Sequence, residues 1–180
     1  TDANTRVAEM LSGGIDAIVE VPADNVPLFA KDNRFKLYEA TGPHVWYGML
    51  NASLPPFDDL RVRQAVNYAV NKQNIVKYIL QGSADVAEGP IPSAFDWAYD
   101  QQTTPYPYDP KKARELIKQA GAEGKKIIFY VTEGGSGMLD PIPMATAIQA
   151  DLKAVGLSVD IQTFEWNTYL SKVNAGLKQA

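Results

Sequence analysis

The chain has 180 residues, of which 46% are hydrophobic, enough to bury a substantial core in one domain or a small pair of domains. Its formal net charge is −4 and its charges are interspersed, so no broad positive surface is available for a phosphate backbone, and nucleic acid is not expected as a partner. Without cysteine, disulfides, thiolate catalysis and cysteine-ligated zinc are excluded. No apolar run approaches the roughly 20 residues that cross a bilayer, so insertion of this stretch into a membrane is not expected.

The N-terminal part of the chain alternates between short helical and strand patterns. Residues 5–11 predict a helix that ends at a glycine pair, and residues 15–21 predict a strand because their apolar residues alternate. An Asp-Asn pair can cap a short helix over residues 24–31. Residues 35–40 and 45–50 are apolar and aromatic, and each predicts a further strand.

Residues 51–82 predict a helical hairpin. Asp58 or Asp59 can cap the first helix, Asn71 the second, and Gly82 stands where a glycine commonly ends a helix. Apolar side chains recur at helical spacing in each, namely Val62, Ala65, Val66, Ala69 and Val70 in the first and Ile75, Val76, Ile79 and Leu80 in the second.

A long irregular loop is predicted over residues 83–107, where glycine, proline, serine and aromatic residues follow one another without periodicity. A helix then begins, because Asp109 is a cap, Pro110 suits the first helical position and Gly121 closes the segment. Its apolar face consists of Ala113, Leu116, Ile117 and Ala120.

The C-terminal part of the chain follows a strand, helix, strand, helix order. Strands are expected over residues 127–131 and 157–164, with a helix over residues 144–155 between them. This order is a βαβ crossover, which implies two parallel strands packed under the helix. Residues 165–177 predict a final helix.

The glycine-rich residues 134–137 connect a predicted strand to a predicted helix. Such a turn can present N–H groups to an anion, but a plain connecting loop is favoured, since the spacing GxGxxG is absent. Pro141 and Pro143 are expected to delay the following helix beyond a tight phosphate turn.

The stretch NASLPPFDDLRVRQAVNYAVN resembles the extracytoplasmic solute-binding proteins of peptide and nickel ABC transporters, family 5. Further pieces agree with that family in order: Gly82 with Gly89-Pro90-Ile91-Pro92, Tyr108-Asp109-Pro110 with Lys112-Ala113-Arg114-Glu115-Leu116 and Ala120-Gly121, and Ala147-Ile148-Gln149-Ala150-Asp151-Leu152 with Val155-Gly156-Leu157. The resemblance covers nearly the whole chain. Family members are two to three times longer and begin with an export signal, so the chain resembles an internal piece of such a protein.

The resemblance implies an α/β fold, a periplasmic-binding-protein type II-like lobe with a mixed sheet and flanking helices, plus a short piece of the neighbouring lobe. Residues 1–50 would be the tail of the first lobe with a strand that crosses between the lobes, and residues 51–180 most of the C-terminal, ligand-binding lobe. The implied function is that of a receptor in the periplasm, outside the cytoplasm, which captures a peptide between two lobes. It delivers the peptide to an ABC permease. The resemblance implies neither enzymatic activity nor a cofactor.

Aromatic side chains are the best candidates for a ligand site. Trp166 begins a helix directly after a strand, and in peptide-binding relatives a tryptophan at the equivalent place lines the ligand cavity. Tyr169 lies one turn further on the same face, and Tyr47 and Trp97 are weaker candidates. For any one of the aromatic residues in the chain, ordinary core packing is the competing interpretation.

Catalytic and metal sites are not expected. His44 is the single histidine and follows Gly42-Pro43, so a loop position is favoured over an acid or base role. The Asp58-Asp59 pair is favoured as a helix cap over a metal site. Within the family, a nickel chelate, haem or an oligosaccharide are alternative ligands. A hydrolase and a chemosensory receptor are the alternatives outside that function.

Overall fold

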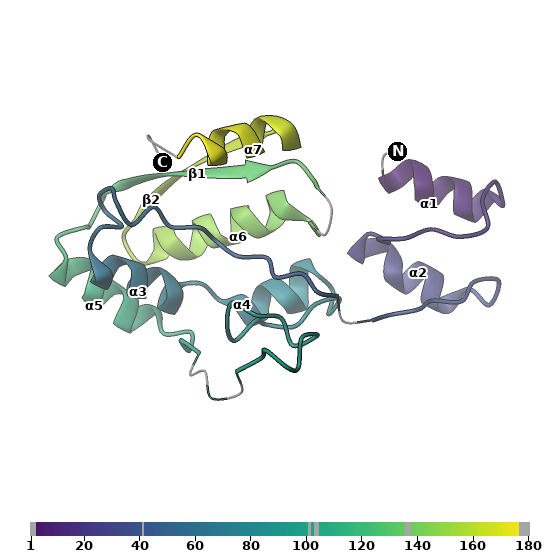
Figure 1. Cartoon of the computed structure of the whole chain (residues 1–180), viewed down its shortest axis with the longest axis horizontal. Helices are drawn as coiled ribbons and strands as arrows, with labels where there is room; N and C mark the ends of the chain where they lie inside the picture. Colours follow the sequence, from purple (N-terminus) through teal and green to yellow (C-terminus); the bar gives the residue numbers. More distant parts are fainter. Residues whose placement is uncertain (1–2, 41, 101, 103–104, 136–137, 177–180) are drawn as a thin grey trace.

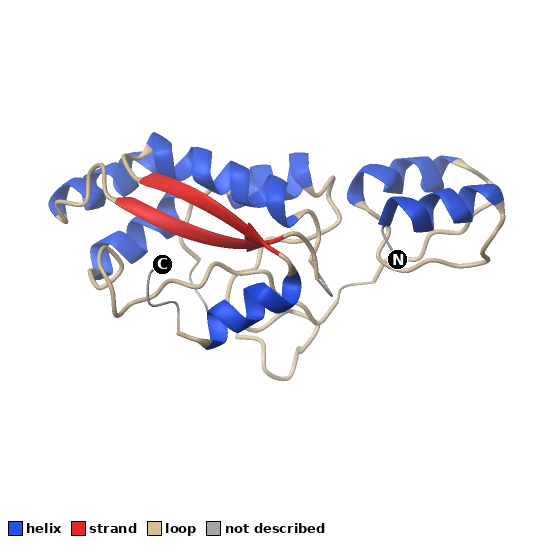
Figure 2. Ribbon diagram, turned by 90° about the horizontal axis from the view of Figure 1, so that it is seen from above, coloured by secondary structure: helices blue, strands red, loops and turns tan. Residues whose placement is uncertain are grey.

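A computed structural model describes residues 3–40, 42–100, 102, 105–135 and 138–176. A small N-terminal part lies at one end of the molecule, apart from the larger remainder (Figures 1 and 2). It holds helix α1 (Ala3–Ser12), the 3-10 helix η1 (Ala23–Asn25) and helix α2 (Val26–Lys31). Both predicted helices are therefore confirmed, but the predicted cap of the second is wrong, because no side chain caps η1 or α2.

A helical hairpin opens the larger part. It contains α3 (Leu60–Ala69), the single turn α4 (Lys72–Asn74) and the π-helix η2 (Ile75–Ile79). The Asp59 carboxylate accepts a hydrogen bond from the Arg61 N–H, and the Asn71 side chain accepts one from the Asn74 N–H, so both predicted caps are confirmed. Gly82 has a φ of 80°, a left-handed conformation that suits glycine after a helix.

Helix α5 (Pro110–Gln119) packs against α3. The Asp109 carboxylate accepts hydrogen bonds from the N–H groups of Lys111 and Lys112, and Pro110 occupies the first turn, as the sequence predicts. The described residues between 83 and 107 form no regular element, which agrees with the predicted loop.

The predicted βαβ crossover is confirmed. Strand β1 (Lys126–Thr132) pairs in parallel with β2 (Ser158–Phe164), and α6 (Pro141–Ala154) connects them. Helix α7 (Trp166–Asn174) follows β2, and α6 and α7 lie on opposite faces of the two strands (Figure 1). These contents confirm the α/β fold class.

Helix α6 begins three residues earlier than expected. The interpretation of Pro141 and Pro143 as residues that delay the helix is wrong, because Pro141 is the first helical residue. Proline suits this position, since its fixed φ is helical and the N–H group that it lacks would have no partner in the helix. The same rule identified the start of α5.

The main core lies where α3, α5 and α6 meet the strands. Its most deeply buried side chains are those of Val62, Ala65, Ala69, Ala113, Ile117, Ala122, Leu152, Val155 and Leu157. A second, smaller core consists of Ile75, Leu80 and Met144, with Trp46 packed against it. No helix in the described ranges is long and apolar enough to cross a membrane.

The three strands predicted in the N-terminal part are wrong. The structure assigns no strand to residues 15–21, 35–40 or 45–50. A strand is completed by hydrogen bonds to a neighbour, and the only strands that pair in the described residues are β1 and β2. The alternating side chains bury no common face either, since Val19 is 77% exposed and Tyr38 is 78% exposed.

Candidate functional site

The two strands end side by side. Thr132 at the end of β1 is the register partner of Phe164 at the end of β2, so the segments that follow both strands emerge at the same edge of the sheet. Gly134 and Gly135 follow β1, and Trp166 follows β2. In open α/β sheets, ligands bind outside the carboxyl ends of the strands, so a ligand site is expected at this edge.

The Glu165 side chain fixes the start of α7 at this edge. Its carboxylate accepts hydrogen bonds from the N–H groups of Asn167, at 2.9 Å, and Thr168, at 3.2 Å. An acidic cap satisfies N–H groups that the first helical turn leaves without partners. The cap therefore sets Trp166 as the first helical residue directly beyond the strand.

Trp166 and Tyr169 form a stacked pair. Three residues apart on one helix, they share a face, and their ring centroids are 6.0 Å apart with an interplanar angle of 20°. Both side chains are partly exposed. Their outer surface is therefore open to a flat or apolar group.

Tyr47, from a distant part of the chain, lies near Tyr169. Burial raises the pKa of the Tyr169 hydroxyl, and the nearby Tyr47 hydroxyl raises this pKa further. Tyr47 itself is 67% exposed. We refer to Trp166, Tyr169 and Tyr47 as the aromatic cluster. Of the four predicted ligand residues, the structure stacks Trp166 on Tyr169 and places the Tyr47 hydroxyl near enough to Tyr169 to influence its pKa.

Trp97 lies elsewhere. It is 84% exposed, and its ring partner is Phe95, at a centroid distance of 6.4 Å. Among the residues that the structure describes, no ring contact links Trp97 with the aromatic cluster. Its role as a ligand residue stays a prediction.

Thr132 is a site residue that sequence reasoning missed. Its side chain is 1% exposed, and its hydroxyl donates a hydrogen bond to the Gly134 carbonyl and accepts one from the Gly134 N–H. These bonds hold the glycine turn against the end of β1. A threonine two residues before a glycine pair is the signal in the sequence, but a threonine in a strand is too common to be informative alone.

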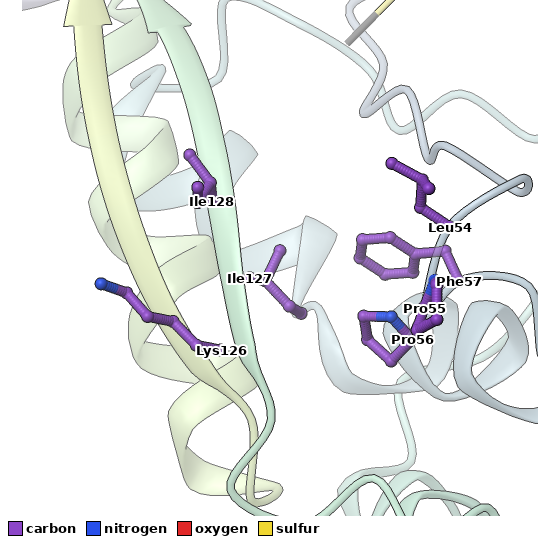
Figure 3. Close-up of a pocket in the computed structure, with 7 residues that line it drawn as sticks. All are labelled: Leu54, Pro55, Pro56, Phe57, Lys126, Ile127 and Ile128. Atoms are coloured by element: carbon purple, nitrogen blue, oxygen red, sulfur yellow. The ribbon is translucent and has the colours of Figure 1, made fainter. Parts of the chain in front are cut away.

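Two cavities lie away from the aromatic cluster. One, of about 280 Å³, opens between residues 54–57 and the first residues of β1, along the edge that does not pair with β2 (Figure 3). The other, of about 320 Å³, lies between the end of α1 and Arg34-Phe35. Neither is lined by a predicted ligand residue.

The site offers stacking surfaces and phenolic hydroxyls, which suit binding. His44, predicted in a loop, is exposed outside any helix or strand. Asp59 caps α3, as expected. No group of three or more His, Asp or Glu residues that could hold a metal ion occurs within the described ranges.

The fold and the sequence relatives define a class of extracellular binding proteins. The chain belongs to the bacterial extracellular solute-binding proteins, family 5. The family model for the middle region of these proteins matches residues 1–180. This confirms the resemblance seen in the sequence.

Individual relatives agree. The chain is 33% identical over 177 residues to heme-binding protein A of Haemophilus influenzae, covering 97% of this chain and 32% of that protein. It is 34% identical over 180 residues to the dipeptide-binding protein of Escherichia coli, covering 99% of this chain and 34% of that protein. The structure also matches that of the ABC transporter-associated periplasmic binding protein DppA from Helicobacter pylori in complex with the peptide STSA, with a TM-score of 0.88 and 30% identity, over 98% of this chain and 33% of that one.

The chain therefore spans about a third of the length of these relatives. The fold is that of periplasmic binding proteins of type II. The relatives named here are binding proteins rather than enzymes, which supports a binding role for the chain.

Proposed function

We propose that the chain is the ligand-binding part of a solute receptor of an ABC importer, and that it captures peptides and delivers them to a membrane permease. Capture needs no reaction: a solute selects the closed form of a two-lobed receptor through its contacts with both lobes. The receptor would act outside the cytoplasm, as the family description implies.

The aromatic cluster is the single observation that carries this proposal. Trp166 and Tyr169 stack at the carboxyl end of the parallel strands, which is the usual place for a ligand in an α/β sheet. Tyr47 adds a hydroxyl from a separate segment. Rings with one polar end suit a peptide, which offers both apolar side chains and hydrogen-bonding main-chain groups.

The two parts of the chain fit a receptor with two lobes. We propose that residues 1–50 belong to one lobe and to the segment that crosses between the lobes, and that residues 51–180 belong to the other. The separate position of α1 and α2 supports this division (Figure 1). Tyr47 then stands near the crossing, where the two lobes would meet a ligand.

Peptide is the favoured ligand, because one relative is named a dipeptide-binding protein and another was solved in complex with a peptide. Haem is the second candidate, since a relative of similar identity is named a heme-binding protein and stacked aromatic rings also suit a flat macrocycle. A nickel chelate or an oligosaccharide would need polar groups that lie outside the aromatic cluster.

Native mass spectrometry of the full-length protein, purified without refolding, tests the proposal. The same sample after denaturation is the control. We expect added masses that match short peptides and disappear on denaturation. A single added mass equal to that of haem would contradict the peptide assignment. No added mass, together with no binding of either the tetrapeptide Ser-Thr-Ser-Ala or haemin in titrations, would contradict both.

A further inference from the structure

Gly135 lies against the Trp166 ring more closely than any side chain would permit. A Cβ atom built on Gly135 would be 2.7 Å from Cε3, 2.9 Å from Cζ3 and 3.1 Å from Cδ2 of Trp166. All three atoms belong to the six-membered ring of the indole. Carbon atoms in van der Waals contact are about 3.5–4.0 Å apart, so even alanine at this position would displace one of the two partners.

Hydrogen bonds from described residues on both sides hold the backbone of Gly134 and Gly135. The Thr132 hydroxyl is hydrogen-bonded to both the N–H and the carbonyl of Gly134. The Gly135 carbonyl accepts a hydrogen bond from the Met138 N–H at 3.1 Å. Trp166, in contrast, is only partly buried. We therefore expect a side chain at position 135 to move the indole rather than the backbone of Gly134 and Gly135.

We propose that Gly135 is the positioning residue for Trp166, and that the missing side chain determines where the aromatic cluster meets a ligand. This inference rests on the proposed function for its effect on the ligand, but not for its effect on the indole. Because Trp166 stacks on Tyr169, a displaced indole would also lose that contact. The aromatic surface would change as a unit.

Backbone conformation does not require glycine here. Gly135 is not among the glycines with a positive φ, so alanine can adopt its backbone without strain. Gly134 also lacks a positive φ, and a Cβ atom on it would have no heavy atom within 4 Å. Gly134→Ala is therefore a matched control that adds the same methyl group one residue away, in open space.

The chain holds three tryptophans, so 5-fluorotryptophan gives three ¹⁹F resonances, and Trp166→Phe assigns one of them. We expect Gly135→Ala to shift the Trp166 resonance and to leave those of Trp46 and Trp97 in place, which also shows that the variant is folded. Gly134→Ala should leave all three unchanged. An unmoved Trp166 resonance in Gly135→Ala, or an equal shift in Gly134→Ala, would overturn the proposal.

A double-mutant cycle gives an independent test of the contact. Gly135→Ala should lower the urea midpoint of unfolding in the natural chain, and clearly less in a Trp166→Leu background, because the smaller side chain leaves room for the methyl group. An equal decrease in both backgrounds would overturn a role through Trp166.

Ligand affinity separates this inference from the proposed function. In the full-length protein, Gly135→Ala should weaken binding of Ser-Thr-Ser-Ala about tenfold, whereas Gly134→Ala should not. If the Trp166 resonance shifts but the affinity of a bound peptide is unchanged, Gly135 still positions the indole, and the aromatic cluster is then not the ligand surface.

Discussion

Asp59 combines a helix cap with an ion pair. Its carboxylate accepts hydrogen bonds from the Arg61 N–H, at 2.8 Å, and from the Arg61 guanidinium, at 2.6 Å for the shortest contact. The hydrogen bonds from the Arg61 side chain and main chain lower the pKa of Asp59 below its ordinary value of 3.8. Arg61 also donates to the Gln119 carbonyl at 2.8 Å, so this corner joins the start of α3 to the end of α5.

This lowered pKa predicts a loss of stability in acid. A carboxylate with a lowered pKa in the folded state contributes stability above its unfolded pKa, and this contribution disappears as the pH falls through the folded value. We expect Asp59→Asn to flatten the decrease in the urea midpoint below about pH 4. Arg61→Gln should flatten it in the same way, because it removes the main cause. An unchanged pH profile in both variants would refute this assignment.

The Asp109 side chain caps the start of α5. Its carboxylate satisfies two N–H groups at the start of α5, and Asp109→Ala should lower the free energy of unfolding by about 1 kcal/mol. Asp58→Ala is the control, since Asp58 is exposed and its carboxylate caps no helix. Equal unfolding midpoints for the two variants would contradict the role of the cap.

The elements of the larger part meet through small side chains. Ala65 and Ala69 of α3 and Ala113 of α5 are each 1% exposed or less, so the two helices approach closely. Because this contact has no free space, Ala65→Leu should destabilise the fold by about 1–3 kcal/mol. Ala8→Leu on the exposed face of α1 should have little effect. Chemical denaturation measures the free energy of unfolding of both variants. An Ala65→Leu variant as stable as the natural chain would show that the contact between α3 and α5 has room for a larger side chain.

Elements defined by local chemistry could be predicted from the sequence, whereas elements defined by distant partners could not. Asp59, Asn71 and Asp109 cap helices within three residues of themselves, so their signals are complete in the sequence. Strand patterns at residues 15–21, 35–40 and 45–50 carry no information about a pairing partner, and none pairs in the described structure. Likewise, the family resemblance suggested Trp166, but only the three-dimensional structure reveals its contact with Gly135.

At the level of the whole molecule, strand β1 pairs on one side only in the described residues, so its other edge is free. In the parallel pairing with β2, every second residue of β1 directs its N–H and carbonyl groups away from β2. This unpaired side of β1 lies next to the cavity shown in Figure 3. Such an edge can pair with another chain. We therefore expect residues 1–180 to associate in a concentration-dependent way.

Ile128 lies on that edge and allows a specific test. Its N–H faces away from β2, so Ile128→Pro should suppress association while the pairing with β2 survives. Ile128→Ala keeps the N–H group and is the matched control. Analytical ultracentrifugation distinguishes these outcomes. A clean monomer of the natural sequence at all concentrations would contradict the prediction.

The two-lobe account also predicts weak binding by residues 1–180 alone. A ligand held between two lobes loses most of its contacts when one lobe is largely absent, so the dissociation constant should be about millimolar or higher. Titration with Ser-Thr-Ser-Ala measures this affinity. Micromolar binding would contradict the division into lobes.

The most direct measurement is the affinity of the full-length protein for Ser-Thr-Ser-Ala by isothermal titration calorimetry, before and after Trp166→Ala. An aromatic anchor at a binding site contributes about 2 kcal/mol or more, so we predict binding that is weaker by about 30-fold or more. Tyr78→Ala is the control, because Tyr78 is a 62% exposed aromatic residue outside the aromatic cluster. Equal affinities for Trp166→Ala and the natural protein would show that the aromatic cluster does not bind the ligand.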